Sequence, residues 1–125
     1  MMIDCHNREL IDMSAFSLHD YVVSELLFEN ESVKMNVEYV EKRISPSVCI
    51  RKRRRIAFLG VDRFEFIFSS ERGRSDEIFG MECVDDENVE QKMTLKLVFS
   101  NESYMCIRCQ KVSFETISNA TENAF

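Results

Sequence analysis

Glycine, proline and histidine are scarce in this sequence, which has three glycines, one proline and two histidines in 125 residues. With so few glycines, the chain has no glycine-rich loop that could wrap backbone amides around a phosphate. One proline beside ten phenylalanines argues against an extended linker protein and favours a sheet with aromatic packing. No apolar run approaches the roughly 20 residues that a membrane-spanning helix needs. We therefore expect no membrane segment.

Export signals and paired cysteines are also missing. The first 13 residues lack a basic start followed by an apolar run, so they do not read as a signal peptide. The five cysteines are an odd number, and a chain of this length can bury a core without disulfides. We therefore expect reduced thiols and a cytoplasmic protein. The glycosylation sequons at Asn30, Asn101 and Asn119 are then coincidences, although the first two indicate exposed turns.

Acidic residues outnumber basic residues by 22 to 16, giving a formal net charge of -6 and an isoelectric point of about 5.0. This balance disfavours a protein that coats nucleic acid, because neutralising phosphates requires a basic face. It is compatible with a basic partner protein, since opposite charges steer association. An apolar fraction of 45% is ordinary for a globular protein, and we expect one domain over residues 1–125.

The pattern around which the chain is organised is a β-hairpin over residues 17–39. Val33, Met35, Val37 and Tyr39 alternate with polar residues, which predicts a strand with one buried face. The polar turn at residues 29–32 precedes this strand. Residues 20–28 fit either a strand or a helical stripe, and we expect a strand because a short turn leads directly into the clear strand.

The same alternation predicts strands at residues 64–68, 78–84, 93–99 and 104–114, and Pro46 predicts a loop at residues 41–47. We expect a mainly β domain, an antiparallel sheet or sandwich of about seven strands with at most a short N-terminal helix; an α+β fold is the alternative. Residues 1–15 are expected to be a loosely ordered lead-in and residues 116–125 a loose tail. The predicted core is Val33, Met35, Val37, Phe58, Phe64, Phe66, Leu95, Leu97, Phe99 and Ile107.

Five consecutive cations, Arg51, Lys52, Arg53, Arg54 and Arg55, form the most unusual segment of the chain. One interpretation is a patch that binds nucleic acid or another polyanion, with aromatic residues downstream that could stack on bases. The other interpretation, which we favour, is a solvated loop or strand end held near the acidic remainder of the chain.

Three further groups could carry chemistry, and each has a structural explanation. Cys106 and Cys109 form a CxxC pair, but residues three apart on a strand point to opposite faces, so we expect buried thiols and no metal site. The acidic residues 85–87 and 90 lack the spacing of a calcium loop and predict a solvated loop. No motif indicates a cofactor.

His19 and Asp20 are the third group, because a carboxylate can orient an imidazole for proton transfer. Neighbours on a strand point apart, however, so adjacency in sequence does not make a catalytic dyad. The alternative role is structural, with both side chains bonded to local backbone at the start of the first strand. No serine or cysteine lies in a nucleophile motif.

Two short patterns resemble a group of small uncharacterised bacterial β-rich domains with an FHD-type opening. Residues 16–20, Phe-Ser-Leu-His-Asp, are similar to that opening, although Leu18 stands where the group usually has an aromatic residue. Residues 58–66 are similar to its F-x-G-V-x-x-F-x-F segment, and residues 104–114 to its closing strand. Some of these domains are proposed immunity proteins against bacterial toxins. The resemblance implies a non-enzymatic domain that binds a partner protein, and it transfers no catalytic residues.

Three functional hypotheses follow. The leading one is a non-catalytic, cytosolic protein-binding domain, an immunity protein whose acidic surface captures a basic toxin. The second is nucleic-acid or polyanion binding through residues 51–55, which the net charge disfavours. The third is a small enzyme that uses His19 and Asp20. A homodimer through an exposed edge strand is compatible with all three hypotheses.

Overall fold

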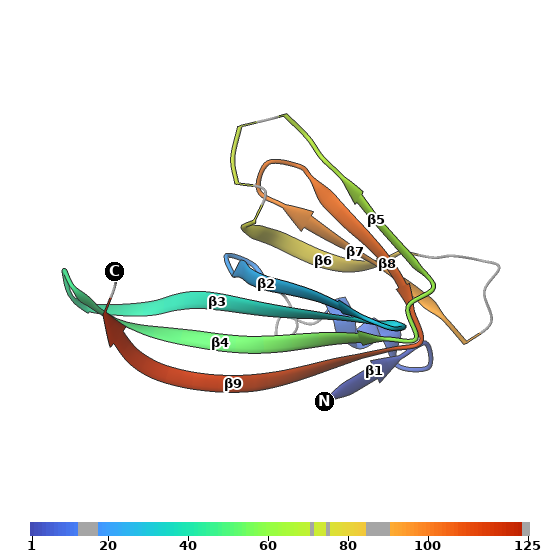
Figure 1. Cartoon of the computed structure of the whole chain (residues 1–125), viewed down its shortest axis with the longest axis horizontal. Coiled ribbons are helices and arrows are strands. Elements are labelled where there is room, and N and C mark those ends of the chain that lie inside the picture. The colour runs from blue at the N-terminus through green and yellow to red at the C-terminus, as the bar shows by residue number, and fades with distance from the viewer. Residues whose placement is uncertain (13–17, 71, 75, 85–90, 124–125) are drawn as a thin grey trace.

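The protein is described here by a computed structural model that covers residues 1–12, 18–70, 72–74, 76–84 and 91–123. Nine strands in these residues form two antiparallel sheets, one of five strands and one of four (Figure 1). The predicted mainly β, antiparallel fold is confirmed. Within the described residues, the one helical element is the short 3-10 helix η1 (Arg8–Asp12), which agrees with the predicted limit of one short N-terminal helix.

Each sheet has a simple order of strands. The first sheet contains, from edge to edge, β1 (Met2–Asp4), β9 (Lys111–Asn123), β4 (Val48–Leu59), β3 (Ser32–Ser45) and β2 (Val22–Glu29). The second contains β5 (Arg63–Ile67), β8 (Tyr104–Cys109), β7 (Met93–Phe99) and β6 (Ile78–Val84). No helix in the described residues is long and apolar enough to span a membrane.

The β2–β3 hairpin has the predicted position and strand identity. Phe28 lies opposite Val33, and Glu29 lies opposite Ser32 across the turn. Asn30 occupies this turn with φ of 49°, a left-handed angle that asparagine tolerates better than most residues. The buried residues Val33, Met35 and Val37 share one face of β3, as the alternation predicts.

Two single connections carry the chain between the sheets at one end of the molecule (Figure 1). Residues 60–62 lead from β4 to β5, and Gln110 leads from β8 back to β9. The Gln110 N–H donates to the Leu59 carbonyl at 2.8 Å, which fixes the two connections together. Gly60 has φ of 65°, and a Cβ there would lie 2.7 Å from Gln110 Oε1. The positive φ and the lack of space for a Cβ both explain why this position is a glycine.

A second junction joins β2 to the segment that precedes β6. Val22 forms an isolated antiparallel bridge with Glu77. The Val23 N–H donates to the Asp76 carbonyl at 2.9 Å, and the Ile78 N–H donates to the Tyr21 carbonyl at 2.8 Å. The sheets are therefore connected by backbone hydrogen bonds at two separate places, and the core lies between them.

The core contains most of the predicted residues. Val33, Met35, Val37, Phe58, Leu95, Leu97, Phe99 and Ile107 are all buried. Phe64 is only partly buried, and the prediction is wrong for Phe66, whose side chain is 44% exposed. Both lie on β5, which pairs only with β8 among the described strands, so its inward face is incompletely covered.

Several boundaries differ from those predicted. β3 continues to Ser45, and Pro46 lies in the tight turn of a long β3–β4 hairpin, because the strand keeps β4 as its partner. The expected strand at residues 104–114 is divided at Gln110 between the two sheets. The expected tail forms part of β9, which pairs with β4 up to Asn123. The expected lead-in contributes buried Ile3 and Ile11 to the core.

The three longest strands, β3, β4 and β9, extend beyond Val22, the first residue of β2, as a three-stranded ribbon. We call this ribbon the arm and define it as residues 39–45, 48–53 and 118–123 of β3, β4 and β9. In Figure 1 the arm reaches away from the second sheet towards the C-terminus. The arm carries the first half of the basic segment.

Candidate functional site

The five cations of residues 51–55 lie in the interior of β4, and the expectation of a loop or strand end is wrong. β4 is flanked by β3 and β9, and every residue from Arg51 to Arg55 has a cross-strand partner on both. Alternation along the strand therefore separates the run into two faces. Arg51, Arg53 and Arg55 share one face, and Lys52 and Arg54 share the other.

Arg51, Arg53 and Arg55 form the outward-facing set, and they contact acidic and amide groups of the neighbouring strands. Arg51 Nη1 lies 3.2 Å from Glu38 Oε2, and Arg53 Nε lies 3.9 Å from the same oxygen. Arg55 donates from Nε to Asn36 Oδ1 at 3.1 Å and lies 3.6 Å from Glu115. A hydrogen bond with Cys49, together with Glu38, raises the pKa of Arg51. Internal carboxylates thus balance much of this face, which does not favour a nucleic-acid surface.

On the opposite face of β4 from Arg51, Arg53 and Arg55, Arg54 lies beside two aromatic rings. The Arg54 guanidinium carbon lies 6.0 Å from the centroids of both the Tyr21 and Phe114 rings. Tyr21 and Tyr39 are in ring contact at 5.4 Å. Tyr21, Lys52, Arg54 and Thr116 line a hollow of about 170 Å³.

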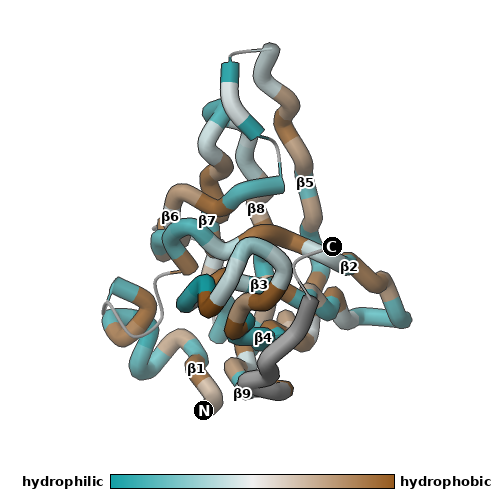
Figure 2. Tube along the Cα trace, turned by 90° about the vertical axis from the view of Figure 1, so that its left-hand side faces the viewer, coloured by the Kyte–Doolittle hydropathy of each residue, from teal (hydrophilic) through white to brown (hydrophobic). Residues whose placement is uncertain are grey.

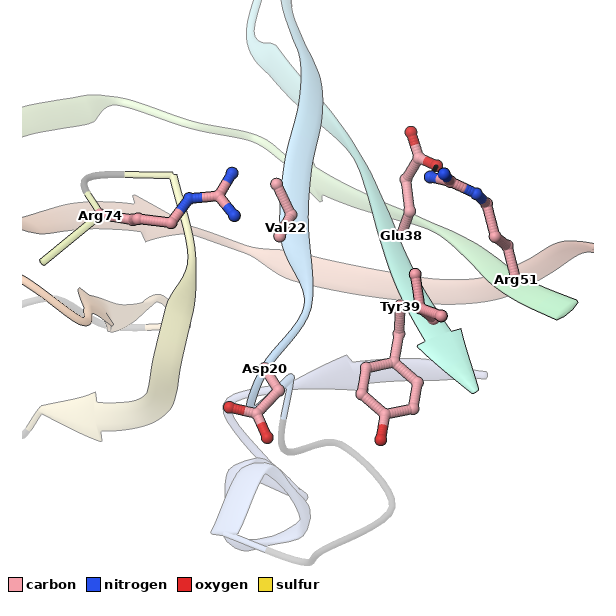
Figure 3. Close-up of a pocket in the computed structure, with 7 residues that line it drawn as sticks. Asp20, Val22, Glu38, Tyr39, Arg51 and Arg74 are labelled. Atoms are coloured by element: carbon pink, nitrogen blue, oxygen red, sulfur yellow. Dashed lines mark hydrogen bonds and ion pairs between the residues drawn. The ribbon is translucent and has the colours of Figure 1, made fainter. Parts of the chain in front are cut away.

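A second, larger pocket of about 350 Å³ lies where β2 begins (Figure 3). Its lining mixes both signs of charge: Asp20, Val22, Glu38, Tyr39, Val40, Arg51 and Arg74. Glu38 is paired with Arg51, and Arg74 forms a two-point ion pair with Asp76 at 2.9 and 3.0 Å. Because these charges are matched within the protein, the pocket does not select a ligand of one charge.

An apolar groove of about 230 Å³ opens between β2 and β5, the facing edge strands of the two sheets. It is lined by Val23, Leu26, Phe64, Phe66, Asp76, Phe99 and Met105. The groove ends on one side at the backbone hydrogen bond from the Val23 N–H to the Asp76 carbonyl. It ends on the other side at the edge-to-face contact of Phe28 with Phe64, whose ring centroids are 5.0 Å apart. Figure 2 shows apolar segments along both β2 and β5.

Large apolar side chains of β2, of β5 and of the residue that follows β5 remain exposed. Phe28, Phe66 and Phe68 are 60%, 44% and 68% exposed, and Ile67 is 45% exposed. Sequence reasoning missed this surface because the alternation of residues 64–68 has the same appearance in an edge strand as in a central strand.

His19 and Asp20 are brought together, because they lie in a turn before β2 and not within a strand. His19 Nε2 lies 3.4 Å from Asp20 Oδ1, and Asp20 has φ of 68°. His19 Nδ1 lies 2.7 Å from the Phe79 carbonyl, 60 residues away. Since a carbonyl only accepts, Nδ1 carries a proton, and Nε2 can donate to Asp20 only when the ring is protonated. The exposed pair thus attaches the turn to β6.

The CxxC residues point to opposite faces of β8, as predicted. Cys109 is buried, and Cys106 is half-buried on the other face. Burial raises the pKa of Cys109 to about 12 and also raises the pKa of Cys106. Within the described residues, no three His, Cys, Asp or Glu side chains are grouped to hold a metal ion. The acidic residues 85–87 and 90 lie outside the described residues.

Comparisons of the chain with protein-family models, curated proteins and solved structures found no match. The resemblance to FHD-type bacterial domains therefore stays a prediction. Function has to be argued from the surfaces described above.

Proposed function

We propose that this protein is a non-catalytic protein-binding domain whose docking surface is the groove between β2 and β5. The supporting observation is the exposure of Phe66, which lines an apolar hollow, and of Phe28, whose ring contacts the lining residue Phe64. Contiguous exposed apolar surface is uncommon on a monomeric protein and marks contact sites. Aromatic side chains are also enriched where proteins bind one another.

The proposed occupant is a segment of a basic partner protein that inserts one apolar anchor side chain into the groove. Six of the seven lining residues are apolar, and the seventh is Asp76, whose carboxylate is paired with Arg74. Both bordering strands carry carboxylates: Glu25 and Glu29 on β2 and Glu65 on β5, of which Glu29 pairs with Lys34 and Glu65 with Arg63. The net charge of -6 favours fast, salt-sensitive capture of a basic protein.

The proposed setting is the bacterial cytoplasm, where the domain would act as an immunity protein against a toxin. All five cysteines are free thiols, which is compatible with a reducing compartment. The resemblance of residues 16–20 and 58–66 to the FHD-type domains also supports this role. An immunity protein acts by covering its target, so it needs a docking surface and no catalytic residue.

The experiment is affinity capture from the source cells with the wild-type chain and with Phe66→Glu, followed by measurement of the complex with the purified partner. Phe66→Glu places a charge at the mouth of the groove without removing a buried side chain. Phe79→Gln is the matched control, because Phe79 is 63% exposed but lies on β6, outside the groove. We expect the wild type and Phe79→Gln to bind the same protein and Phe66→Glu to lose it.

Two results would overturn the proposal. One is a captured protein whose affinity is unchanged by Phe66→Glu. The other is a wild-type chain that forms a stable dimer in sedimentation equilibrium and becomes monomeric on Phe66→Glu, which would make a second copy the occupant.

A further inference from the structure

Gly80 is a glycine that neither backbone angle nor crowding explains. It lies inside β6, opposite Val98 on β7. A positive φ occurs at Gly60 and Gly73 but not at Gly80, so a side chain is allowed there. Apart from its two chain neighbours, no described residue has an atom within 4 Å of the position that a Cβ would take. Because glycine weakens a strand interior, such a position often marks where another molecule approaches closely.

The surface beside Gly80 is hollowed. The hollow has a volume of about 320 Å³ and is lined by Phe79, Gly80, Met81, Glu82 and Val98. Met81 is buried, so the alternation along β6 turns Gly80 and Glu82 away from the core, towards the outer surface of the second sheet. A closed cavity of about 150 Å³ is enough to hold a benzene molecule. This open hollow therefore has room for one phenyl ring.

A phenyl ring is exposed next to this hollow. The register with β7 passes from Ile78 to Gly80, so Phe79 is an extra residue in β6, and bulges of this kind redirect a side chain. Phe79 is 63% exposed. The His19 Nδ1–H donates to the Phe79 carbonyl, and the two rings meet edge to face with centroids 5.6 Å apart. These contacts orient Phe79 in advance, which lowers the entropy cost of a contact made through its ring.

The exposed ring and the hollow belong to adjacent residues, which makes this patch complementary to itself. In a two-fold symmetric interface the same patch of both copies meets, so a protruding group must find a hollow within that patch. Two β6 strands that cross antiparallel about an axis beside these residues place each Phe79 over the other Gly80. Glu82 lies directly opposite Lys96 on β7, so the patch carries one charge of each sign and does not repel its own copy.

We infer that the outer surface of β6 binds a second copy of this chain, with Phe79 of each protomer inserted into the hollow at Gly80 of the other. One ring per protomer makes a small interface, so the dissociation constant of the dimer is expected to be about 10–100 μM. The inference is independent of the proposed protein-binding groove. That groove borders β5, which is the opposite edge strand of the second sheet from β6.

The test is sedimentation equilibrium of the full chain and its variants. We expect a reversible dimer that tightens as sodium chloride is raised, because salt screens the repulsion between two chains of net charge -6. Phe79→Ala removes the ring and should weaken the dimer by about tenfold or more. Gly80→Val fills the hollow and should weaken it as much, with a Tm no lower than that of the wild type. Phe68→Ala removes an equally exposed ring beyond β5 and is the matched control, with a change of less than about twofold.

A mixture of the two variants tests the insertion itself. Phe79→Ala keeps the hollow and Gly80→Val keeps the ring, so a mixed dimer regains one of the two contacts. An equal mixture should therefore associate more tightly than either variant alone and less tightly than the wild type.

Three outcomes would overturn the inference. The first is a wild-type chain that stays monomeric up to about 1 mM, where a specific contact would be populated. The second is a dimer of unchanged affinity in both Phe79→Ala and Gly80→Val. The third is a dimer that dissociates on Phe66→Glu and persists in Gly80→Val, since that would place the second copy in the groove.

Discussion

Asp62 and Arg108 are 46 positions apart in the sequence and are joined by two hydrogen bonds. Arg108 Nε donates to Asp62 Oδ1 at 2.6 Å, and the Asp62 N–H donates to the Arg108 carbonyl at 3.1 Å. Lys92 Nζ also contacts the other carboxylate oxygen at 2.5 Å. The carboxylate thus connects the β4–β5 crossing to β8 and to the start of β7.

The first prediction concerns the pH dependence of stability. The hydrogen bonds from Arg108 and Lys92 lower the pKa of Asp62 from its ordinary value of 3.8 to about 2. A carboxyl group whose pKa is lower in the folded state stabilises the protein above pH 4, and this contribution is lost as the pH falls towards 2. We expect the difference in Tm between the wild type and Asp62→Asn to shrink over that interval in thermal unfolding experiments.

Glu102→Gln provides the control for this experiment. Glu102 is an exposed carboxylate in the β7–β8 turn. Its replacement should leave the acid limb of the stability curve parallel to that of the wild type. A constant difference between Asp62→Asn and the wild type from pH 6 to pH 2 would show that the ion pairs do not contribute.

The sequence was sufficient to predict the β2–β3 hairpin and the strands of the second sheet, but not β1, β4 or most of β9, nor which strands are neighbours. Alternation located Met93–Phe99 and Ile78–Val84 with the observed boundaries, because side-chain direction on a strand depends only on local geometry. It could not show that residues 51–55 lie in a central strand. Five charged residues in a row are typical of a solvent-exposed segment. These five form a central strand because the long strands β3 and β9 pair with them on both sides.

The candidate sites depended on pairing even more strongly. Arg54 and Tyr21 come together only through folding, and no spacing in the sequence predicts their contact. By contrast, the two-residue period of a strand was enough to predict that Cys106 and Cys109 point to opposite faces. The contact of His19 with Asp20 was missed because the strand begins two residues later than the predicted boundary.

The second prediction compares two phenylalanines that the alternation treats alike. Phe58 is completely buried, whereas Phe66 is 44% exposed at the groove. Phe58→Ala should lower the free energy of unfolding by about 3–5 kcal/mol, because it leaves a cavity in the core. Phe66→Ala should cost about 1 kcal/mol or less, since its surroundings are open to solvent. Urea denaturation of both variants would measure this difference, and equal losses would contradict the assignment of the groove.

The third prediction concerns thiol chemistry. Burial raises the pKa of Cys109 to about 12, so its thiolate is scarcely populated at neutral pH. We expect iodoacetamide at pH 7.5 to leave Cys109 unmodified in the folded protein and to modify it in urea, as read by mass spectrometry. Because Cys106 lies on the opposite face of β8, mild oxidation should form no disulfide between them. Recovery of that disulfide from native protein would contradict the orientation of β8.

The fourth prediction concerns two turns of the same sequence, Asn-Glu-Ser, that the structure treats differently. Asn30 is exposed, whereas Asn101 is 4% exposed beneath the loop that follows β5. Asn101 Oδ1 accepts from the Ser103 N–H at 3.1 Å, and its amide donates to the Ser69 carbonyl at 3.3 Å. Ser103 Oγ in turn accepts from the Ser69 N–H at 2.9 Å. The second sequon therefore holds the loop against the β7–β8 turn, and the prediction that it is exposed is wrong.

Asn101→Ala should consequently lower the free energy of unfolding by about 1–3 kcal/mol, because it removes the side-chain acceptor of the buried Ser103 N–H. Ser103→Ala should have a similar effect for the same reason. Ser32→Ala is the matched control in the first turn: its hydroxyl donates to the Glu29 carbonyl at 2.8 Å at an exposed position, where water can replace it. We expect that control to stay within about 0.5 kcal/mol of the wild type in urea denaturation. Equal costs at Ser103 and Ser32 would mean that the loop does not bury the second turn in solution.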